Sequence, residues 1–303
     1  MRFFLLIAAM VLQGCQAATP VDQSSPVDAE AEAARIEQVL SGLSERAKLL
    51  EHIHGWGVIE LQWADDQGSH FEQGDLEFWI DGNERLAVRI SKLGDTYFWI
   101  GTDGVEAWVF DLSDRPRRLL SGSMQAIQES AVHEGSWLSI LDMIRMMRAG
   151  LGALPPPARE DVLSLGPGED GALLLLFRDN TDSNRRVRME LSPNTWRPTQ
   201  LSLLNSNGTS LITAGTRSSR TKRVVIPGRS SLASPIISAV LEVRDEAAVD
   251  TLARFAFEGM TTDLSDQPLN RIFDMDILRK SLRPEVEGPL LELENPEDDS
   301  KTH

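Results

Sequence analysis

Hydrophobic and polar residues alternate along most of this chain, the pattern of β-strands that turn one face toward a core. In the expected strand at 71–80, Leu76 and Phe78 lie on one face and Glu77 on the other. Turn signals such as the Asp-Gly pair at 81–82 separate the runs and predict antiparallel neighbours. The expected strands are 55–64, 71–80, 85–90, 96–101, 105–111, 172–177, 186–191, 198–204 and 210–214, with further ones near 119–120, 222–226 and 235–243.

Three segments have helical spacing instead. They are 30–52, 136–149 and a short one at 245–257. Ser136 is the expected N-cap of the second helix. The apolar stripe of that helix consists of Trp137, Ile140, Leu141, Ile144 and Met147. Because a long antiparallel sheet must close or hide its apolar face, we expect this helix to cover the sheet.

The start of the chain is similar to a bacterial lipoprotein signal. Arg2 precedes an apolar run at 3–12, which is too short to span a bilayer and fits the core of a secretory signal. Leu12-Gln13-Gly14-Cys15 resembles the lipobox, whose cysteine is diacylated before the signal is cleaved. We therefore expect Cys15 to carry a diacylglyceryl membrane anchor, since two or three acyl chains hold a protein stably.

Composition divides the chain into four expected regions. Residues 1–15 are the signal that ends at the lipidated cysteine, 16–33 a flexible tether, 34–283 one domain, and 284–303 a disordered acidic tail. Gln16 stands where the Gram-negative sorting rule uses aspartate for inner-membrane retention. The expected location is therefore the cell envelope, at the outer membrane and facing the periplasm.

Charge and cysteine content exclude several classes of protein. The net charge of −16 argues against a nucleic-acid partner and against broad contact with anionic headgroups. Cys15 is the only cysteine, so the folded domain has neither an internal disulfide nor a thiol nucleophile. Its stability must come from burial of a core, for which the chain is long enough.

Two blocks of sequence resemble the periplasmic lipoprotein carrier and receptor family, LolA and LolB. The residues QGDL at 73–76 are similar to the family's "G-x-L" strand, and TDGVEAWVFD at 102–111 to its "D-G-x-x-x-W-x-Y" strand. The block at 190–208 is similar to the family's later strand, turn and "D-x-x-G" hairpin. The order of elements matches over about 34–226 and leaves 227–303 outside.

The resemblance implies an α+β, β-rich fold in which a curved antiparallel sheet forms an unclosed half-barrel covered by a few helices. The family uses the enclosed cavity for acyl chains, which would make this chain a lipid- or acyl-binding envelope protein without catalytic activity or cofactor. Aromatic, aliphatic and methionine side chains suit such a cavity. The candidate lining residues are Leu76, Phe78, Val88, Phe98, Trp108, Phe110, Trp137, Ile140, Ile144 and Met147. We expect Phe78, Phe98, Trp108 and Phe110 to share one face.

The sequence departs from the carrier pattern in one place. In the carrier, a basic residue after the "G-x-L" strand helps to fasten the lid. Here that segment is Ile80-Asp81-Gly82-Asn83, which contains no base. Opening triggered by a ligand is therefore not implied for this chain.

Other chemistry has weak support. His52 and His54 could face the same way on a strand and bind a metal with Glu60 or His70, although polar residues at a helix-to-strand junction explain them as well. The residues HEGSW at 133–137 do not form H-E-x-x-H, and neither a G-x-S-x-G elbow nor a phosphate-binding glycine loop occurs. No metal or nucleotide cofactor is expected.

Three functions stay open on these grounds. The first is an anchored protein that holds a lipid or lipoprotein acyl chain, with a role in lipid or lipoprotein trafficking. The second is a scaffold on the same fold that binds a protein partner or senses envelope stress. The third is a surface hydrolase with two carboxylates. The sequence identifies neither the ligand nor the protein partner, and an ordinary filled core is an alternative to the cavity.

Overall fold

The structure is a computed structural model of the chain. It describes residues 26–65, 68–126, 140–179, 184–216, 220–230, 232, 234–246, 252–265 and 267–290. None of the described helices combines the length and the apolar character needed to cross a bilayer.

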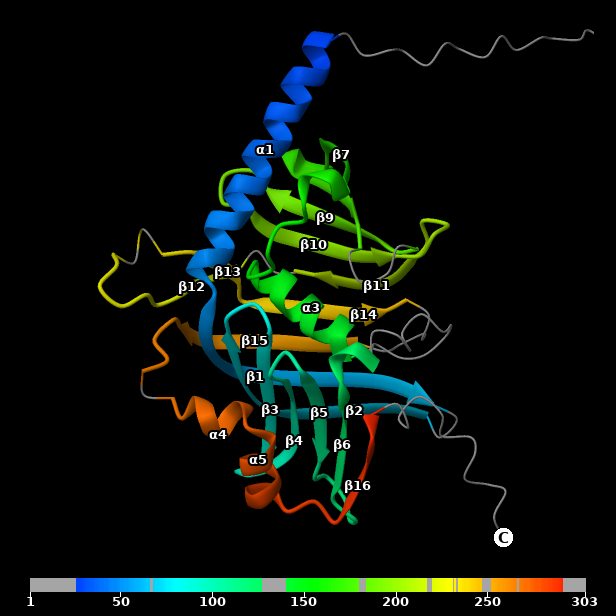
Figure 1. Cartoon of the computed structure of the whole chain (residues 1–303), viewed down its shortest axis with the longest axis vertical. Coiled ribbons are helices and arrows are strands. Elements are labelled where there is room, and N and C mark those ends of the chain that lie inside the picture. The colour runs from blue at the N-terminus through cyan, green and yellow to red at the C-terminus, as the bar shows by residue number, and fades with distance from the viewer. Residues whose placement is uncertain are drawn as a thin grey trace, which may run out of the picture.

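One large curved sheet forms the body of the protein (Figure 1). Its 14 strands lie in the order β16-β6-β5-β4-β3-β2-β1-β15-β14-β11-β10-β9-β8-β7. The first half contains β1 (His52–Asp65), β2 (Gly68–Asp81), β3 (Arg85–Lys92), β4 (Asp95–Thr102), β5 (Glu106–Asp111) and β6 (Arg118–Ser123). The second half contains β7 (Val162–Pro167), β8 (Leu173–Arg178), β9 (Arg186–Ser192), β10 (Arg197–Leu204), β11 (Ser210–Gly215) and β14 (Val240–Asp245).

A late strand joins the two halves. β15 (Leu252–Thr261) pairs antiparallel with β1 on one side and with β14 on the other. The expected helix at 245–257 is therefore wrong over 252–257, while 247–251 lie outside the described residues. Phe255 and Phe257 are both buried at a spacing of two, and that alternation decides for a strand over a helix.

One face of the sheet, here called the inner face, is covered by two helices. α1 (Pro26–Leu49) and α3 (Ile140–Leu151) contribute Val39, Leu43, Met146 and Met147 to the main core. Figure 1 shows α3 lying across the sheet. A short two-stranded sheet, β12 (Thr221–Arg223) with β13 (Ile236–Ser238), lies beside α1. The expected α+β half-barrel, open and covered by a few helices, is confirmed.

Two boundaries differ from the sequence expectation. α1 begins at Pro26, so 26–33 is helical rather than part of a tether. Proline suits the first turn of a helix. At the other end, β16 (Val286–Pro289) pairs parallel with β6, so 286–289 belongs to the sheet and not to a disordered tail.

The C-terminal region covers part of the opposite, outer face. α4 (Leu269–Phe273) and α5 (Met275–Leu282) supply Ile272, Phe273 and Leu278 to a second core. The sheet residues of that core are Trp79, Ala87, Trp99, Trp108, Phe110 and Leu119. The region that the family resemblance leaves out therefore adds a third layer behind β2–β6.

We expect Leu278→Ala to destabilise the protein by about 2–5 kcal/mol, because the cavity that it leaves lies in the second core. The matched substitution Leu232→Ala removes a leucine that is 82% exposed and should change the stability by less than about 0.5 kcal/mol. Urea denaturation measures both. Equal effects of the two substitutions would contradict the assignment of a second core.

Candidate functional site

The inner face brings together four of the predicted lining residues. Leu76 and Phe78 of β2, Val88 of β3 and Met147 of α3 belong to one buried cluster. Phe78 and Val88 are cross-strand partners and so lie on the same face. Met146 lies beside Met147 in the sequence and joins the cluster. The inner face is thus apolar and is covered by flexible thioether side chains, which adapt to irregular shapes.

The register places two other predicted residues on the outer face. Trp108 is the register partner of Gly101, and Gly101 is the partner of Ala87. Ala87 precedes the inner residue Val88 in β3 and therefore lies on the outer face, so Trp108 is outer too. Phe110 pairs with Trp99 and is outer as well. The expectation that Phe78, Trp108 and Phe110 share one face is therefore wrong. The Trp108 ring packs against Gly101, where an added Cβ would lie 2.9 Å from the ring, so glycine makes room for the indole on this face.

The remaining candidates have different outcomes. Phe98 pairs with Ile90, is half-buried and lies on the inner side. Ile140 and Ile144 lie in α3. Trp137 and Cys15 lie outside the described residues, so they stay predictions.

Arg148 fastens α3 to the sheet. This side chain is only 6% exposed, and its guanidinium donates hydrogen bonds to the backbone carbonyls of Gly82 and Asn83. Burial lowers the pKa of Arg148 to about 10, although the charge of Glu84 opposes the shift, so the group stays protonated at neutral pH. The hairpin that lacks a base in the sequence therefore receives one from the helix. Spacing could not reveal this contact, because it joins positions 65 and 66 residues apart.

A second buried arginine holds the C-terminal end of α3. Arg46 of α1 is 5% exposed and donates to the carbonyls of Leu151, at 2.9 Å, and Ile236, at 2.7 Å. A cation at a helix C-terminus is stabilised by the helix dipole. Burial, and then the charge of Arg197, lowers the pKa of Arg46 to about 10. Gly152 makes room, since a Cβ there would lie 2.1 Å from Arg46 Nε.

The histidines singled out in the sequence lie in ion-pair networks. His54 Nε2 donates to Glu77 Oε1 at 2.8 Å, and Arg89 pairs with the other oxygen of Glu77. His52 Nδ1 is 2.9 Å from Asp81 Oδ1. Within the described part of the chain, histidine, cysteine and acidic residues form no group of three that could hold a metal.

The same network stacks on the outer aromatic residues. The His54 and Trp79 rings lie 5.3 Å apart and nearly parallel, and Trp79 stacks on Trp99 at 5.9 Å. The Arg89 guanidinium lies 5.8 Å and 5.7 Å from the centres of these two indole rings. Trp79 Nε1 donates to Gln267 Oε1 at 3.0 Å. The network therefore binds the outer layer to the sheet.

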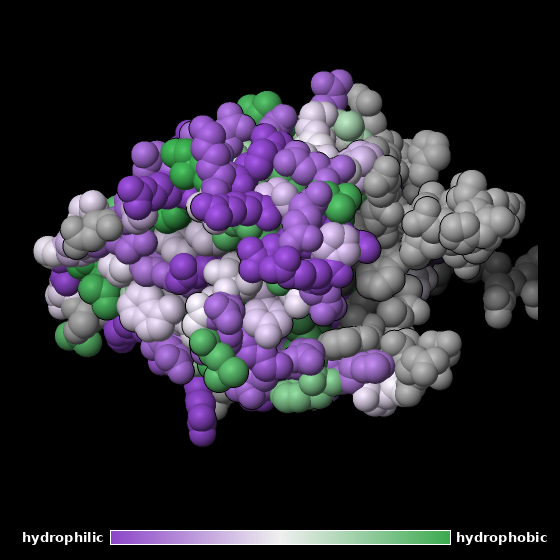
Figure 2. All heavy atoms as spheres, turned by 90° about the horizontal axis from the view of Figure 1, so that it is seen from below, coloured by the Kyte–Doolittle hydropathy of each residue, from purple (hydrophilic) through white to green (hydrophobic). Residues whose placement is uncertain are grey.

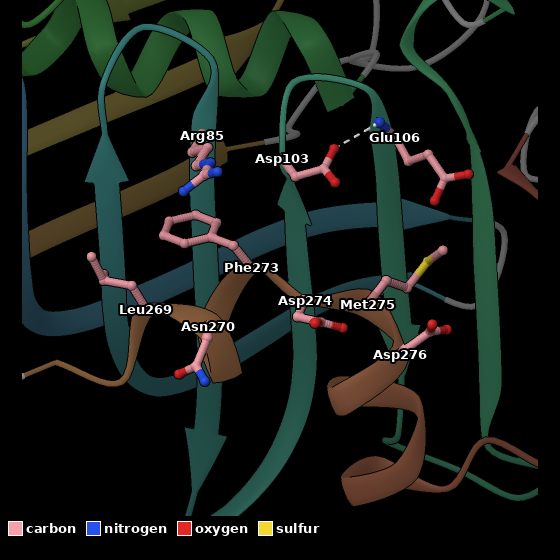
Figure 3. A pocket seen from close by; sticks show the side chains of 9 residues that line it. All are labelled: Arg85, Asp103, Glu106, Leu269, Asn270, Phe273, Asp274, Met275 and Asp276. Carbon is pink, nitrogen blue, oxygen red and sulfur yellow. Dashed lines mark hydrogen bonds between the residues drawn. The ribbon is translucent and has the colours of Figure 1, made fainter.

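A pocket of about 500 Å³ opens where α4 and α5 meet the hairpins of β3–β5 (Figure 3). It is lined by Arg85, Asp103, Glu106, Leu269, Asn270, Phe273, Asp274, Met275 and Asp276. Three of its carboxylates have local partners: Asp103 accepts from the backbone of Val105 and Glu106, Asp274 caps α5, and Asp276 pairs with Arg279. Figure 3 shows Arg85 beside the ring of Phe273. These groups stabilise turns and helix ends rather than converge on a reacting atom.

The end of the molecule that carries α4, α5 and β16 has a largely hydrophilic surface. Figure 2 shows this end from below, with apolar residues scattered among charged and polar ones. Scattered apolar residues are normal on a protein surface and do not indicate an apolar entrance.

Solved structures share this architecture. A domain named for outer membrane lipoprotein sorting, from Vibrio parahaemolyticus, matches with a TM-score of 0.52 and 12% identity over 80% of this chain and 99% of its own. The fold is LolA-like. A DUF1329 family protein from Desulfovibrio piger matches with a TM-score of 0.52 and 11% identity over 80% and 98%.

A LolA superfamily protein from Nitrosomonas europaea matches with a TM-score of 0.48 and 14% identity over 78% of this chain and 98% of its own. No family model matches the sequence, and no curated protein is significantly similar to it. The likeness of fold rests on the two structures with a TM-score of 0.52 and is found at low sequence identity.

Glu77 should make the stability of the LolA-like sheet depend on pH. Burial raises the pKa of Glu77, but the hydrogen bond from His54 and the charge of Arg89 outweigh it, so the pKa lies below the ordinary 4.5. A lowered pKa stabilises the folded state above pH 4.5, and that contribution is lost as the pH falls through the lowered value. We expect Glu77→Gln to cost about 1–3 kcal/mol at pH 7 and progressively less as the pH falls below 4.5.

Glu72→Gln is the matched control on the same strand, because Glu72 is 53% exposed and pairs with exposed Lys92. Its effect should stay below about 1 kcal/mol at every pH. Urea titrations between pH 3 and 7 measure both variants. A cost of Glu77→Gln that does not change with pH would contradict the assignment.

Proposed function

We propose that this protein is a membrane-anchored envelope lipoprotein that holds a lipid or acyl chain between the inner face of its sheet and α3. It acts without catalysis, as a carrier or receptor in lipid or lipoprotein trafficking. The LolA-like fold and the likeness to a domain named for lipoprotein sorting support this proposal.

The observation that carries the proposal is how α3 is attached. Its buried methionines face the apolar inner side of the sheet, while Arg148 and Arg46 hold its C-terminal half by hydrogen bonds to backbone carbonyls. Hydrogen bonds from a charged donor contribute about 1.5–3 kcal/mol each and depend strictly on geometry. If the helix moves and these hydrogen bonds break, the guanidinium and carbonyl groups can form hydrogen bonds with water instead. Such a helix can leave a defined closed position to admit an apolar ligand.

The chemistry of the inner face selects the ligand. The buried side chains there are aliphatic and aromatic, including Leu76, Phe78 and Val88. They make dispersion contacts with an apolar ligand and remove its methylene groups from water, which contributes about 0.8 kcal/mol for each buried CH₂. An unbranched acyl chain is the ligand that gains most from such a surface.

The anchor belongs to the same proposal. We infer that Cys15 carries the diacylglyceryl group and that the protein lies at the outer membrane, facing the periplasm. A single acyl chain gives only marginal binding, so the two or three chains of a lipidated cysteine are what keep a protein of net charge −16 at an anionic surface.

Arg148→Met should loosen α3 and change stability and ligand binding in opposite directions. We expect a loss of about 1.5–3 kcal/mol in stability, faster amide exchange in α3, and tighter binding of a fluorescent fatty acid because the closed state competes less. Hydrogen exchange and fluorescence titration measure these effects. Arg159→Met is the matched control, since Arg159 is 43% exposed beside Glu37 and should leave all three unchanged.

Absence of fatty-acid binding by the wild type and by Arg148→Met would reject the acyl-binding proposal. Mass spectrometry of an organic extract of the purified protein tests it independently for bound lipid. A stoichiometric protein found in its place would favour the scaffold function.

Cys15→Ser should abolish membrane attachment. We expect metabolically labelled palmitate to enter the wild type and not the variant, and the variant to move from the membrane to the soluble fraction of the envelope. Gln16→Asp is the second variant, which should move the labelled protein from the outer to the inner membrane in a Gram-negative host. Equal label in the wild type and Cys15→Ser would contradict lipidation at this residue.

A further inference from the structure

A third apolar cluster lies on the inner face at the β4–β6 end of the sheet. Its buried members are Ala107, Val109 and Leu290, with Ile100, Leu120 and Met124 packed against them. Leu290 follows β16 directly and is 6% exposed. The C-terminal segment 286–290, here called the strap, thus inserts a single leucine into a surface made by the sheet.

The strap reaches an apolar row that is continuous with the proposed acyl site. Phe78 pairs with Val88, Val88 with Ile100, Ile100 with Val109, and Val109 with Leu120. Partners in adjacent strands share a face, so these five side chains form one line across β2–β6. The line begins in the main core, to which Met146 and Met147 of α3 also belong, and ends in the cluster that contains the leucine of the strap.

The strap is held by weak contacts. β16 has four register partners on β6, and two of its four residues are Gly288 and Pro289, which are depleted in strands. Two ion pairs, Arg115 with Glu285 next to the strap and Arg279 with Glu287 within it, join side chains that are 35–78% exposed. Exposed pairs of this kind contribute little. Besides the backbone pairing with β6 and the hydrogen bonds from the amides of Glu285 and Val286 to the Arg117 carbonyl, burial of Leu290 is the main side-chain contact that keeps the strap in place.

We propose that the strap is a displaceable plug: Leu290 occupies the end of the acyl site, and a bound acyl chain extends along the apolar row into the position that Leu290 leaves. This inference rests on the proposed function and assigns a second section to its site. The leucine isobutyl group and the end of an acyl chain have the same chemistry, so they compete for one surface. Release of the plug should tighten ligand binding.

Leu290→Asp places a charge in the apolar cluster and should release the strap. We expect it to bind a fluorescent long-chain fatty acid about tenfold more tightly than the wild type. Leu93→Asp is the matched control, because Leu93 is 98% exposed at the turn between β3 and β4 and should leave affinity unchanged. Circular dichroism confirms that both variants are folded.

A reversible staple decides the question if Leu290→Asp fails to fold. Val286 and Arg118 are register partners and both exposed, so Val286→Cys with Arg118→Cys can form a disulfide that fixes the strap without altering the apolar cluster. Cys15→Ser removes the only other thiol. The oxidised staple should weaken fatty-acid binding about tenfold, and reduction should restore it.

The outcomes separate the two proposals. Fatty-acid binding that is equal in the oxidised, reduced and wild-type proteins overturns the strap proposal and leaves the proposed function intact. No binding by any form, including the released variant, overturns both. Tighter binding on release together with weaker binding on stapling supports the plug.

Discussion

A β-strand turns alternate residues to opposite faces, so a sheet of 14 strands has two broad surfaces to remove from water. The rest of this structure follows from how each is covered. Because cross-strand partners share a face, one register sends Phe78 and Val88 inward and Trp79 and Trp108 outward. α1 and α3 cover the inner surface, whereas α4 and α5 cover the outer surface behind β2–β6. A LolA-like sheet with helices on one side only would leave the second set of tryptophans in water.

The two covers are attached by different physics. The outer helices are held by aromatic and aliphatic burial, with Trp108 fully buried and Leu278 2% exposed. That contact is non-directional and contributes stability. On the inner side, α3 adds two buried guanidiniums, Arg148 and Arg46, whose desolvation offsets much of what their hydrogen bonds contribute. Their net contribution to stability is modest, about 1.5–3 kcal/mol each, and their geometry strictly constrains the position of α3. They fix where α3 rests while keeping the free energy of moving it modest.

Sequence periodicity predicted most strands and the open, helix-covered sheet, because alternation in runs such as 71–80 and 186–191 is set locally. It missed β7 and took β15 for a helix. The faces were harder to assign: which side Trp108 takes depends on the turn at Thr102–Gly104, which offsets one strand against the next. The arginine contacts of α3 were out of reach, since Arg148 meets Gly82 only after the sheet has curved. The local sequence pattern thus predicts the secondary-structure elements, whereas the register between strands decides which side chains line the site.

The outer layer gives a physical reason why the proposed exchange of the inner cover would leave the sheet folded. If β2–β6 were buried on their inner face alone, uncovering that face would expose both faces of these strands and unfold them. With Trp79, Trp99 and Phe110 already buried under α4 and α5, the strands keep one complete core whatever lies on their inner side. Under the proposed function, an acyl chain would then replace Leu290 on the inner row from Phe78 to Leu120 while the outer core stays intact. Placing stability on one face leaves the other face free for the proposed ligand.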